Sequence, residues 1–304
     1  SCYNIFVQMH KCCKEVSSMR KFLVLFLSLA MVIACCSLAS AEAYTEQDIT
    51  IDAGYHQIPA TLTLPEAAEG KTYPAVIMLH GNGSTRHEAG NAYDFAAPEM
   101  AKAGIATIRF DYIGNGDSTS DYIDFTYDKG VEDAMKCYDY LAALGTIDME
   151  HVGIMGWSQG GRLALLTAGR NDVFTSVCTW AGAYDQKGSE EEQYEIAKKN
   201  GYYEVTYDWR DSLKQSPAYY ECAMAIDYAK EVANIKAPIL AINGKEDTVV
   251  TPETAQEIVD ASTNPDSQLL LLDGADHTFC VFSGDDTVLR TLVQDTIDWF
   301  NRTL

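Results

Sequence analysis

Short runs of apolar residues alternate with amphipathic segments along most of this chain. The apolar runs predict strands at 75–79, 105–111, 152–156, 176–180, 238–243 and 269–272. Apolar residues spaced three to four positions apart predict helices at 92–103, 127–144, 159–168, 252–261 and 288–300. Buried strands that alternate with helices are typical of a parallel sheet covered on both faces. We therefore expect an α/β protein with a mostly parallel central sheet flanked by helices.

Two stretches depart from this alternation of buried strands and amphipathic helices. Residues 49–64 alternate polar and apolar positions around Gly54, which predicts a β-hairpin at the sheet edge. Residues 183–236 are polar and rich in tyrosine, and they lie between two predicted strands. We interpret this segment as a lid over the carboxyl ends of the strands, where open α/β sheets bind ligands. Residues 42–304 would then form one domain with a lid at approximately 183–236.

The first 41 residues have the pattern of an export leader. Met19-Arg20-Lys21 is a short basic start, and residues 22–36 are apolar except for Ser28. Ala39-Ser40-Ala41 has the small residues of a signal-peptidase site. The apolar run is short for a membrane span, which needs about 20 residues. We expect a cleaved signal peptide and an exported protein, with an uncleaved anchor as the alternative.

A second processing route competes with simple cleavage. Val32-Ile33-Ala34-Cys35 resembles a bacterial lipobox, which would place a lipid on Cys35 and hold the protein at a membrane. Translation is expected to start at Met19, with Met9 as the alternative. The expected location is thus secreted, periplasmic or at the cell surface as a lipoprotein.

The charge and the cysteine content limit which partners and ligands we expect. The chain has 44 Asp and Glu against 22 Lys and Arg, and its formal net charge is −22 at pH 7. Such a surface repels phosphate backbones, so we expect no nucleic-acid partner. Four cysteines follow the leader without metal-ligand spacing, and we expect buried thiols and no metal site. The alternative is one disulfide involving Cys222.

Gly156-Trp157-Ser158-Gln159-Gly160 is the only G-x-S-x-G pentapeptide in the chain. It follows a predicted strand and precedes a predicted helix, as a nucleophile elbow does. In such an elbow the serine is strained and its Oγ is exposed above the sheet. The adjacent helix N-terminus stabilises developing negative charge. Ser158 is therefore the candidate nucleophile.

A serine hydroxyl needs a general base at neutral pH. His277 directly follows the strand 269–272, so its loop is expected at the catalytic edge of the sheet. His87, in a polar loop, is the weaker competitor. His80 lies at a strand end and is expected to hydrogen-bond the loop backbone instead.

The base needs an acid that holds one tautomer, and in this fold the acid lies between serine and histidine in the chain. Asp247 fits this order. We expect the apolar pair Val249-Val250 to bury its side of the loop. The adjacent Glu246 is the alternative.

The transition state also needs two hydrogen-bond donors for the oxyanion. One is the backbone N–H of Gln159, the residue after the nucleophile. The second is expected from the loop Leu79-His80-Gly81-Asn82-Gly83, and we assign it to the backbone N–H of Asn82.

Together these motifs resemble the α/β-hydrolase superfamily and, within it, the cinnamoyl and feruloyl esterases. The likeness rests on residues 80–83, 109–118, 244–250 and 273–277. We interpret residues 109–118, which are similar to the family's R-F-D-x-x-G-x-G-x-S stretch, as architectural. The resemblance implies an α/β-hydrolase fold with an inserted lid that forms an aromatic acyl pocket. In this lid Asp185, Tyr207 and Trp209 are candidate substrate contacts, and exposed lid tyrosines are the alternative.

The expected activity is that of a serine carboxylic ester hydrolase acting through an acyl-enzyme, without a cofactor. Its substrates would be small aromatic (cinnamoyl or feruloyl type) or short-chain esters. The elbow Gly-Trp-Ser-x-Gly-Gly also resembles that of prolyl-oligopeptidase-like peptidases, so a serine peptidase or amidase is the first alternative. A non-catalytic binding protein on the same scaffold is the second.

Overall fold

The computed structural model describes residues 44–66, 70–185 and 190–304. The predicted leader, with its signal-peptidase motif and Cys35, lies outside these residues. Within them, no helix combines the length and apolar character that crossing a membrane requires.

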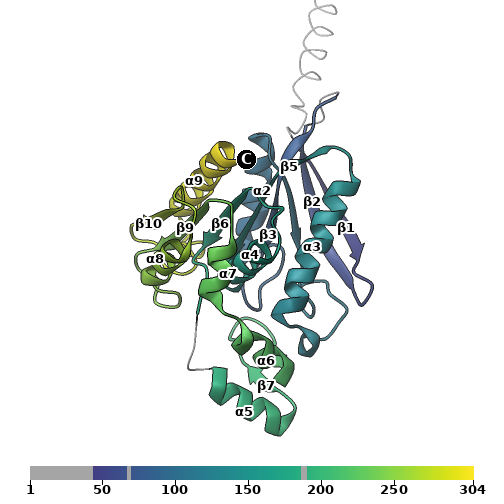
Figure 1. Cartoon of the computed structure of the whole chain (residues 1–304), viewed down its shortest axis with the longest axis vertical. Coiled ribbons are helices and arrows are strands. Elements are labelled where there is room, and N and C mark those ends of the chain that lie inside the picture. Colours follow the sequence, from purple (N-terminus) through teal and green to yellow (C-terminus); the bar gives the residue numbers. More distant parts are fainter. Residues whose placement is uncertain (1–43, 67–69, 186–189) are drawn as a thin grey trace, which may run out of the picture. The chain divides into compact units, whose positions relative to one another are not determined.

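In the described part of the chain, one eight-stranded sheet has the order β1-β2-β4-β3-β5-β6-β9-β10 (Figure 1). Its strands are β1 (Tyr44–Asp52), β2 (Gln57–Pro65), β3 (Tyr73–Leu79), β4 (Ala106–Phe110), β5 (Ile147–Trp157), β6 (Ser176–Trp180), β9 (Ile239–Gly244) and β10 (Gln268–Leu272). β2 pairs antiparallel with both β1 and β4, and all other neighbours are parallel. The mostly parallel sheet and the edge hairpin are confirmed.

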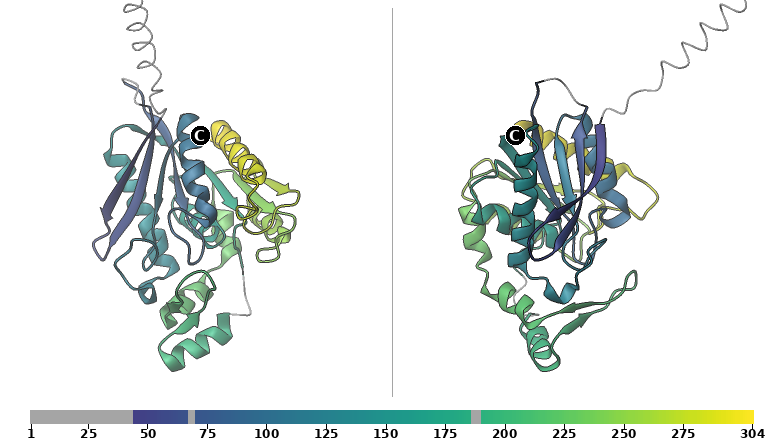
Figure 2. Two further views of the ribbon diagram at one scale, coloured as in Figure 1. Left: turned by 180° about the vertical axis from the view of Figure 1, so that it is seen from behind. Right: turned by 90° about the vertical axis from the view of Figure 1, so that its right-hand side faces the viewer.

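Helices cover both faces of this sheet (Figures 1 and 2). One face carries α2 (Ala92–Lys102) and α9 (Thr287–Thr303), and the other carries α3 (Tyr127–Ala143), α4 (Gln159–Arg170), α7 (Tyr228–Asn234) and α8 (Pro252–Ala261). Alternate side chains of β3 point to opposite faces: Ile77 packs into the α3–α4 side and Val76 into the α2–α9 side. A strand buried on both faces has a continuous apolar sequence, which is why the sequence pattern located these strands well.

The segment between β6 and β9 contains more regular structure than its polar sequence predicted. It forms α5 (Glu190–Asn200), a small antiparallel sheet of β7 (Tyr203–Val205) and β8 (Leu213–Gln215), α6 (Pro217–Ala225) and then α7. Figure 1 shows α5, β7 and α6 grouped together beyond one end of the large sheet. α7 instead packs on α4, where a Cβ at Gly169 would lie 2.3 Å from the carbonyl oxygen of Glu231. The role of this segment as a lid remains a prediction.

The four cysteines after the leader are free thiols: Cys137 and Cys178 are buried, and Cys222 and Cys280 are partly buried. Burial raises the pKa of the Cys137 and Cys178 thiols well above the usual value, so both stay protonated and inert.

Candidate functional site

The turn that carries Ser158 joins β5 to α4. Ser158 has φ 54° and ψ −118°, a conformation that residues with a Cβ rarely adopt. A Cβ at Gly156 would lie 2.1 Å from the carbonyl oxygen of Gly160, and a Cβ at Gly160 would lie 2.1 Å from that of Leu79. The turn therefore requires these two glycines, and it leaves Ser158 at the N-cap of α4.

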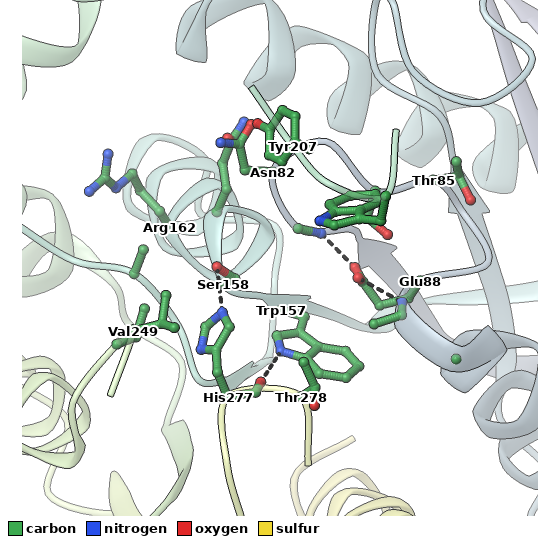
Figure 3. Close-up of a pocket in the computed structure, with 18 of the residues that line it drawn as sticks. Asn82, Thr85, Glu88, Trp157, Ser158, Arg162, Tyr207, Val249, His277 and Thr278 are labelled. Carbon is green, nitrogen blue, oxygen red and sulfur yellow. Dashed lines mark hydrogen bonds between the residues drawn. The ribbon is translucent and has the colours of Figure 1, made fainter. Parts of the chain in front are cut away.

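Ser158, His277 and Asp247 form one hydrogen-bonded series (Figure 3 shows the Ser158–His277 pair). His277 Nε2 lies 3.2 Å from Ser158 Oγ, and His277 Nδ1 lies 2.8 Å from Asp247 Oδ2. Since a carboxylate only accepts, the Nδ1 proton faces Asp247 and Nε2 is left to accept the hydroxyl proton. This arrangement can activate a serine hydroxyl as a nucleophile.

Backbone donors hold the Asp247 carboxylate in place. Oδ1 accepts the N–H groups of Val249 at 2.8 Å and Val250 at 2.9 Å, while the Asp247 side chain is 0% exposed. Val250 is buried, but Val249 is 65% exposed, so the expectation that both valines bury this loop is wrong for Val249. These two N–H bonds, which no sequence pattern shows, hold the Asp247 carboxylate in place. The neighbouring Glu246 side chain is exposed and makes no such contacts with the described residues.

The competing histidines have other partners. His87 Nδ1 bonds Asp94 at 2.7 Å, and His87 does not line the cavity that contains Ser158. His80 is buried, with Nδ1 donating to the Gly81 carbonyl at 2.8 Å and Nε2 accepting the Tyr112 N–H at 3.3 Å. Burial lowers the pKa of His80 to about 4, so the ring stays neutral.

Contacts of the Gly81 carbonyl set the direction of the Asn82 N–H. This carbonyl accepts from His80 Nδ1 and from the Ser84 N–H at 3.1 Å. Because the peptide between Gly81 and Asn82 is planar, its N–H points the opposite way. A Cβ at Gly81 would lie 3.5 Å from Ser158 Cβ, so this loop packs directly on the elbow. Asn82 and Gln159 line the same cavity as Ser158.

The cavity at Ser158 has a volume of about 830 Å³. It is lined by residues of the elbow, α3, α4, the loop that follows β3, the Asp247 and His277 loops and the segment between β6 and β9: Gly81, Asn82, Ser84, Thr85, Glu88, Ala89, Gly90, Tyr127, Trp157, Ser158, Gln159, Arg162, Ala183, Tyr207, Trp209, Tyr219, Val249, Val250, His277, Thr278 and Phe282. Figure 3 shows Arg162 and Val249 on one side of Ser158, with Glu88 and Thr85 on the other.

Two of the three lid residues singled out from the sequence line this cavity. They are Tyr207 and Trp209, whereas Asp185 is exposed and lies outside it. Arg210 ties their loop to the Asn82 loop by donating from Nη1 to the Gly83 carbonyl at 2.5 Å. Burial raises the pKa of Tyr207 to about 12, so its hydroxyl is neutral and able to donate.

Three apolar side chains of the cavity lining are exposed to solvent. Trp209, Val249 and Phe282 are 64%, 65% and 72% exposed, and all three line the cavity. They come from three separate loops, so no single sequence motif could have assembled them.

Arg162 and Trp157 are site residues that the sequence did not assign. Arg162 is buried in the cavity wall, where Nη1 donates to the Tyr127 hydroxyl at 2.8 Å and lies 3.6 Å from a Glu190 carboxylate oxygen. Its Nε and Nη2 have no hydrogen-bond partner among the described residues. Trp157 Nε1 donates to the His277 carbonyl at 3.0 Å and thereby holds the loop of the base (Figure 3). An arginine one helical turn after the serine was the available signal for Arg162.

Residues 109–118 lie outside the cavity and have the architectural role expected of them. Asp111 accepts from the Arg86 and Asp117 N–H groups at 2.7 and 2.9 Å, which closes the turn. In the part of the chain that the structure describes, no three His, Cys, Asp or Glu residues are clustered so that they could hold a metal ion.

Two curated relatives match about two fifths of this chain. The putative esterase NocK of Nocardia uniformis subsp. tsuyamanensis is 31% identical over 131 residues, 42% of this chain and 36% of that protein. The 2,6-dihydropseudooxynicotine hydrolase of Paenarthrobacter nicotinovorans is 30% identical over 132 residues, 42% of this chain and 33% of that protein. The matches span about a third of the length of each relative.

Among solved structures, Est1E from Butyrivibrio proteoclasticus, with ferulic acid bound, is similar with a TM-score of 0.69. The match covers 84% of this chain and 98% of Est1E at 21% sequence identity, which shows a shared α/β-hydrolase fold. The sequence profile of the prolyl oligopeptidase family matches residues 91–304, more than half of the chain. With its elbow on a mostly parallel sheet, this chain belongs to the prolyl oligopeptidase family of the α/β-hydrolase superfamily.

Proposed function

We propose that this protein is a serine hydrolase that cleaves carboxylic esters through an acyl-enzyme. The observation that carries the proposal is the hydrogen-bonded series from Ser158 Oγ through His277 to the buried Asp247. Strain at Ser158 supports it, because strained residues persist where surrounding structure over-determines them, and such residues cluster at active sites.

In the proposed reaction, Ser158 Oγ attacks the ester carbonyl carbon while His277 Nε2 takes the hydroxyl proton. The carbonyl oxygen gains negative charge and accepts the N–H groups of Asn82 and Gln159. The carbon–oxygen bond to the alcohol then breaks, and His277 gives its proton to the leaving oxygen. Water enters, loses a proton to His277 and attacks the acyl carbon. The acid leaves, and the proton returns to Ser158.

Small aromatic or short-chain esters are the proposed substrates. Tyr207 and Trp209 supply aromatic surface beside Ser158, and aromatic rings bind each other in tilted or offset geometry with about 0.5–1.5 kcal/mol beyond area burial. The ferulic acid bound to Est1E and the esterase name of NocK support this choice. The excess of acidic residues makes a polyanionic substrate a poor fit.

A serine peptidase or amidase is the second candidate, favoured by membership of the prolyl oligopeptidase family. The same atoms perform both reactions, and the two differ in the leaving group that His277 must protonate.

Turnover assays separate the two candidates. Purified protein is tested on p-nitrophenyl acetate, methyl ferulate and alanine p-nitroanilide, in parallel with Ser158→Ala. We expect hydrolysis of both esters, little release of nitroaniline, and loss of ester turnover in the variant. Faster cleavage of the anilide than of the esters would favour the peptidase, and equal activity of Ser158→Ala would reject both.

We further propose that residues 1–41 direct export, since their basic start, apolar run and small-residue motif match a signal peptide. Mass spectrometry of the mature N-terminus tests this: cleavage after Ala41 supports simple secretion, a lipid on Cys35 supports anchoring, and an intact leader in the cytoplasm rejects export.

A further inference from the structure

Glu88 is a buried carboxylate in the wall of the cavity that the reaction above does not use. Its Oε2 accepts the Gly81 N–H at 2.5 Å, and its Oε1 accepts the Ala89 N–H at 2.9 Å (Figure 3). Burial raises its pKa, and these two N–H bonds oppose that rise.

The backbone at Glu88 is strained. Its φ of 63° and ψ of 175° fall in a region that glycine occupies almost alone, and such a conformation costs about 1–3 kcal/mol. Capping the short 3₁₀ helix η1 (Ala89–Asn91) accounts for the bond from Oε1 to Ala89. It does not account for the second bond, which reaches back seven residues to Gly81. That second bond points to a role at the Asn82 loop.

Gly81 has a peptide on each side, and different groups hold the two. Glu88 binds the N–H of the peptide before Gly81, while His80 and the Ser84 N–H bind the carbonyl of the peptide after it. A glycine has wide conformational freedom, so this loop depends on outside contacts to keep one geometry. With both peptides fixed, the Asn82 N–H has one direction.

We propose that Glu88 is a positioning residue for the oxyanion hole: by accepting the Gly81 N–H, its carboxylate holds the Asn82 N–H toward the carbonyl oxygen of the substrate. The proposal rests on the proposed serine hydrolase function. It assigns Glu88 no contact with the reacting atoms. Its effect reaches them through the loop 80–82.

The substitution Glu88→Gln tests this with a side chain of the same shape. An amide has one accepting end, so the N–H of Gly81 or that of Ala89 loses its partner and faces an NH₂ group. Loss of one oxyanion donor costs about 10²–10³ in turnover. A misdirected donor still stabilises the oxyanion in part. We therefore expect kcat to fall about 10–100-fold with KM within about threefold of wild type.

Two readouts separate positioning from folding. Rates are expressed per active site titrated with a fluorophosphonate, so that misfolded protein does not count. Binding of an aryl trifluoromethyl ketone, whose adduct places an oxyanion in the hole, should weaken by the same factor as kcat/KM. Binding of the uncharged ester methyl ferulate, measured in a Ser158→Ala background so that it is not hydrolysed, should stay within about threefold, because an ester carbonyl carries no full negative charge.

The matched control is Glu99→Gln on α2, where the carboxylate is partly exposed and bonds only Lys102 at 2.7 Å among the described residues. We expect wild-type kinetics for it. The proposal is overturned if Glu88→Gln keeps a per-site kcat within about threefold of wild type. It is also overturned if the affinities for the ketone and for methyl ferulate fall by equal factors.

Amide hydrogen exchange of the wild-type protein tests the same geometry should Glu88→Gln not fold. We expect the Gly81 amide to be protected in the free protein, and the Asn82 amide to become protected only when the trifluoromethyl ketone binds. Rapid exchange at Gly81 would contradict the proposal. Absence of turnover on every ester by the wild type would instead reject the proposed function and leave the exchange result at Gly81 standing.

Discussion

Replacing Asp247 by asparagine changes the group that orients His277 and keeps the shape of the side chain. Oδ1 of Asp247 accepts two backbone N–H groups, so the amide oxygen of the introduced asparagine must occupy that position. The NH₂ group then takes the place of Oδ2 and faces His277 Nδ1. His277 would have to accept at Nδ1 and carry its proton on Nε2, which is the wrong tautomer for taking the Ser158 proton.

The size of the effect follows from charge and tautomer. A protonated His277 and the Asp247 carboxylate, with centres about 4 Å apart, attract by about 4 kcal/mol at an effective dielectric constant of about 20. Loss of that attraction alone corresponds to about 10³ in rate. The tautomer change adds to it, and the corresponding acid-to-amide change in serine proteases lowers kcat about 10⁴-fold. We expect a decrease of about 10³–10⁴ for Asp247→Asn.

The assay is the steady-state hydrolysis of p-nitrophenyl acetate, with the thermal midpoint measured by circular dichroism. Glu246→Gln is the control, because its side chain is exposed one position away. We expect the control to keep wild-type kcat and both variants to keep a midpoint near wild type. An Asp247→Asn enzyme with more than a tenth of wild-type kcat would refute this account of the base.

Three further outcomes follow from the site. Trp157→Phe loses the hydrogen bond to the His277 carbonyl, worth about 1 kcal/mol, and should lower kcat about fivefold in the same ester assay. Trp209→Ala should lower kcat/KM for methyl ferulate about threefold to tenfold and leave p-nitrophenyl acetate unchanged, since we expect the feruloyl ring, and not the acetyl group, to contact Trp209. Folding lowers the His80 pKa to about 4, so the unfolded chain protonates first as the pH falls below about 6.5. Urea unfolding at pH 7 and 5 should then show about 2 kcal/mol more loss of stability in wild type than in His80→Gln, and equal losses would contradict this.

Sequence patterns predicted the sheet, the elbow and the chain order of Ser158, Asp247 and His277, because each depends on local chemistry. Buried strands are apolar throughout, and the Ser158 turn has room only for glycine at positions 156 and 160. Chain order does not separate Asp247 from Glu246, since both lie between Ser158 and His277. The sequence-based choice rested on the apolar pair Val249-Val250, and this reason was wrong for Val249.

Contacts between distant segments were beyond such reasoning. The Glu88–Gly81 bond and the Trp157–His277 bond connect loops whose approach depends on the completed sheet. Helix α5, in the segment after β6, was missed for another reason. α5 is a charged surface helix, with Glu190, Glu191 and Glu192 in its first turn and two lysines in its last, and it has only one buried residue. Its ends complement the helix dipole, but it lacks the apolar stripe that sequence reading relies on.

The central claim is that Ser158 is a nucleophile that His277 activates as a general base. Peptide mass mapping after reaction with a fluorophosphonate tests it most directly. The account predicts one phosphonyl group on Ser158 in the wild-type protein and none on the same time scale in His277→Ala. A phosphonyl group on another residue, or an unlabelled protein that still hydrolyses esters, would contradict it.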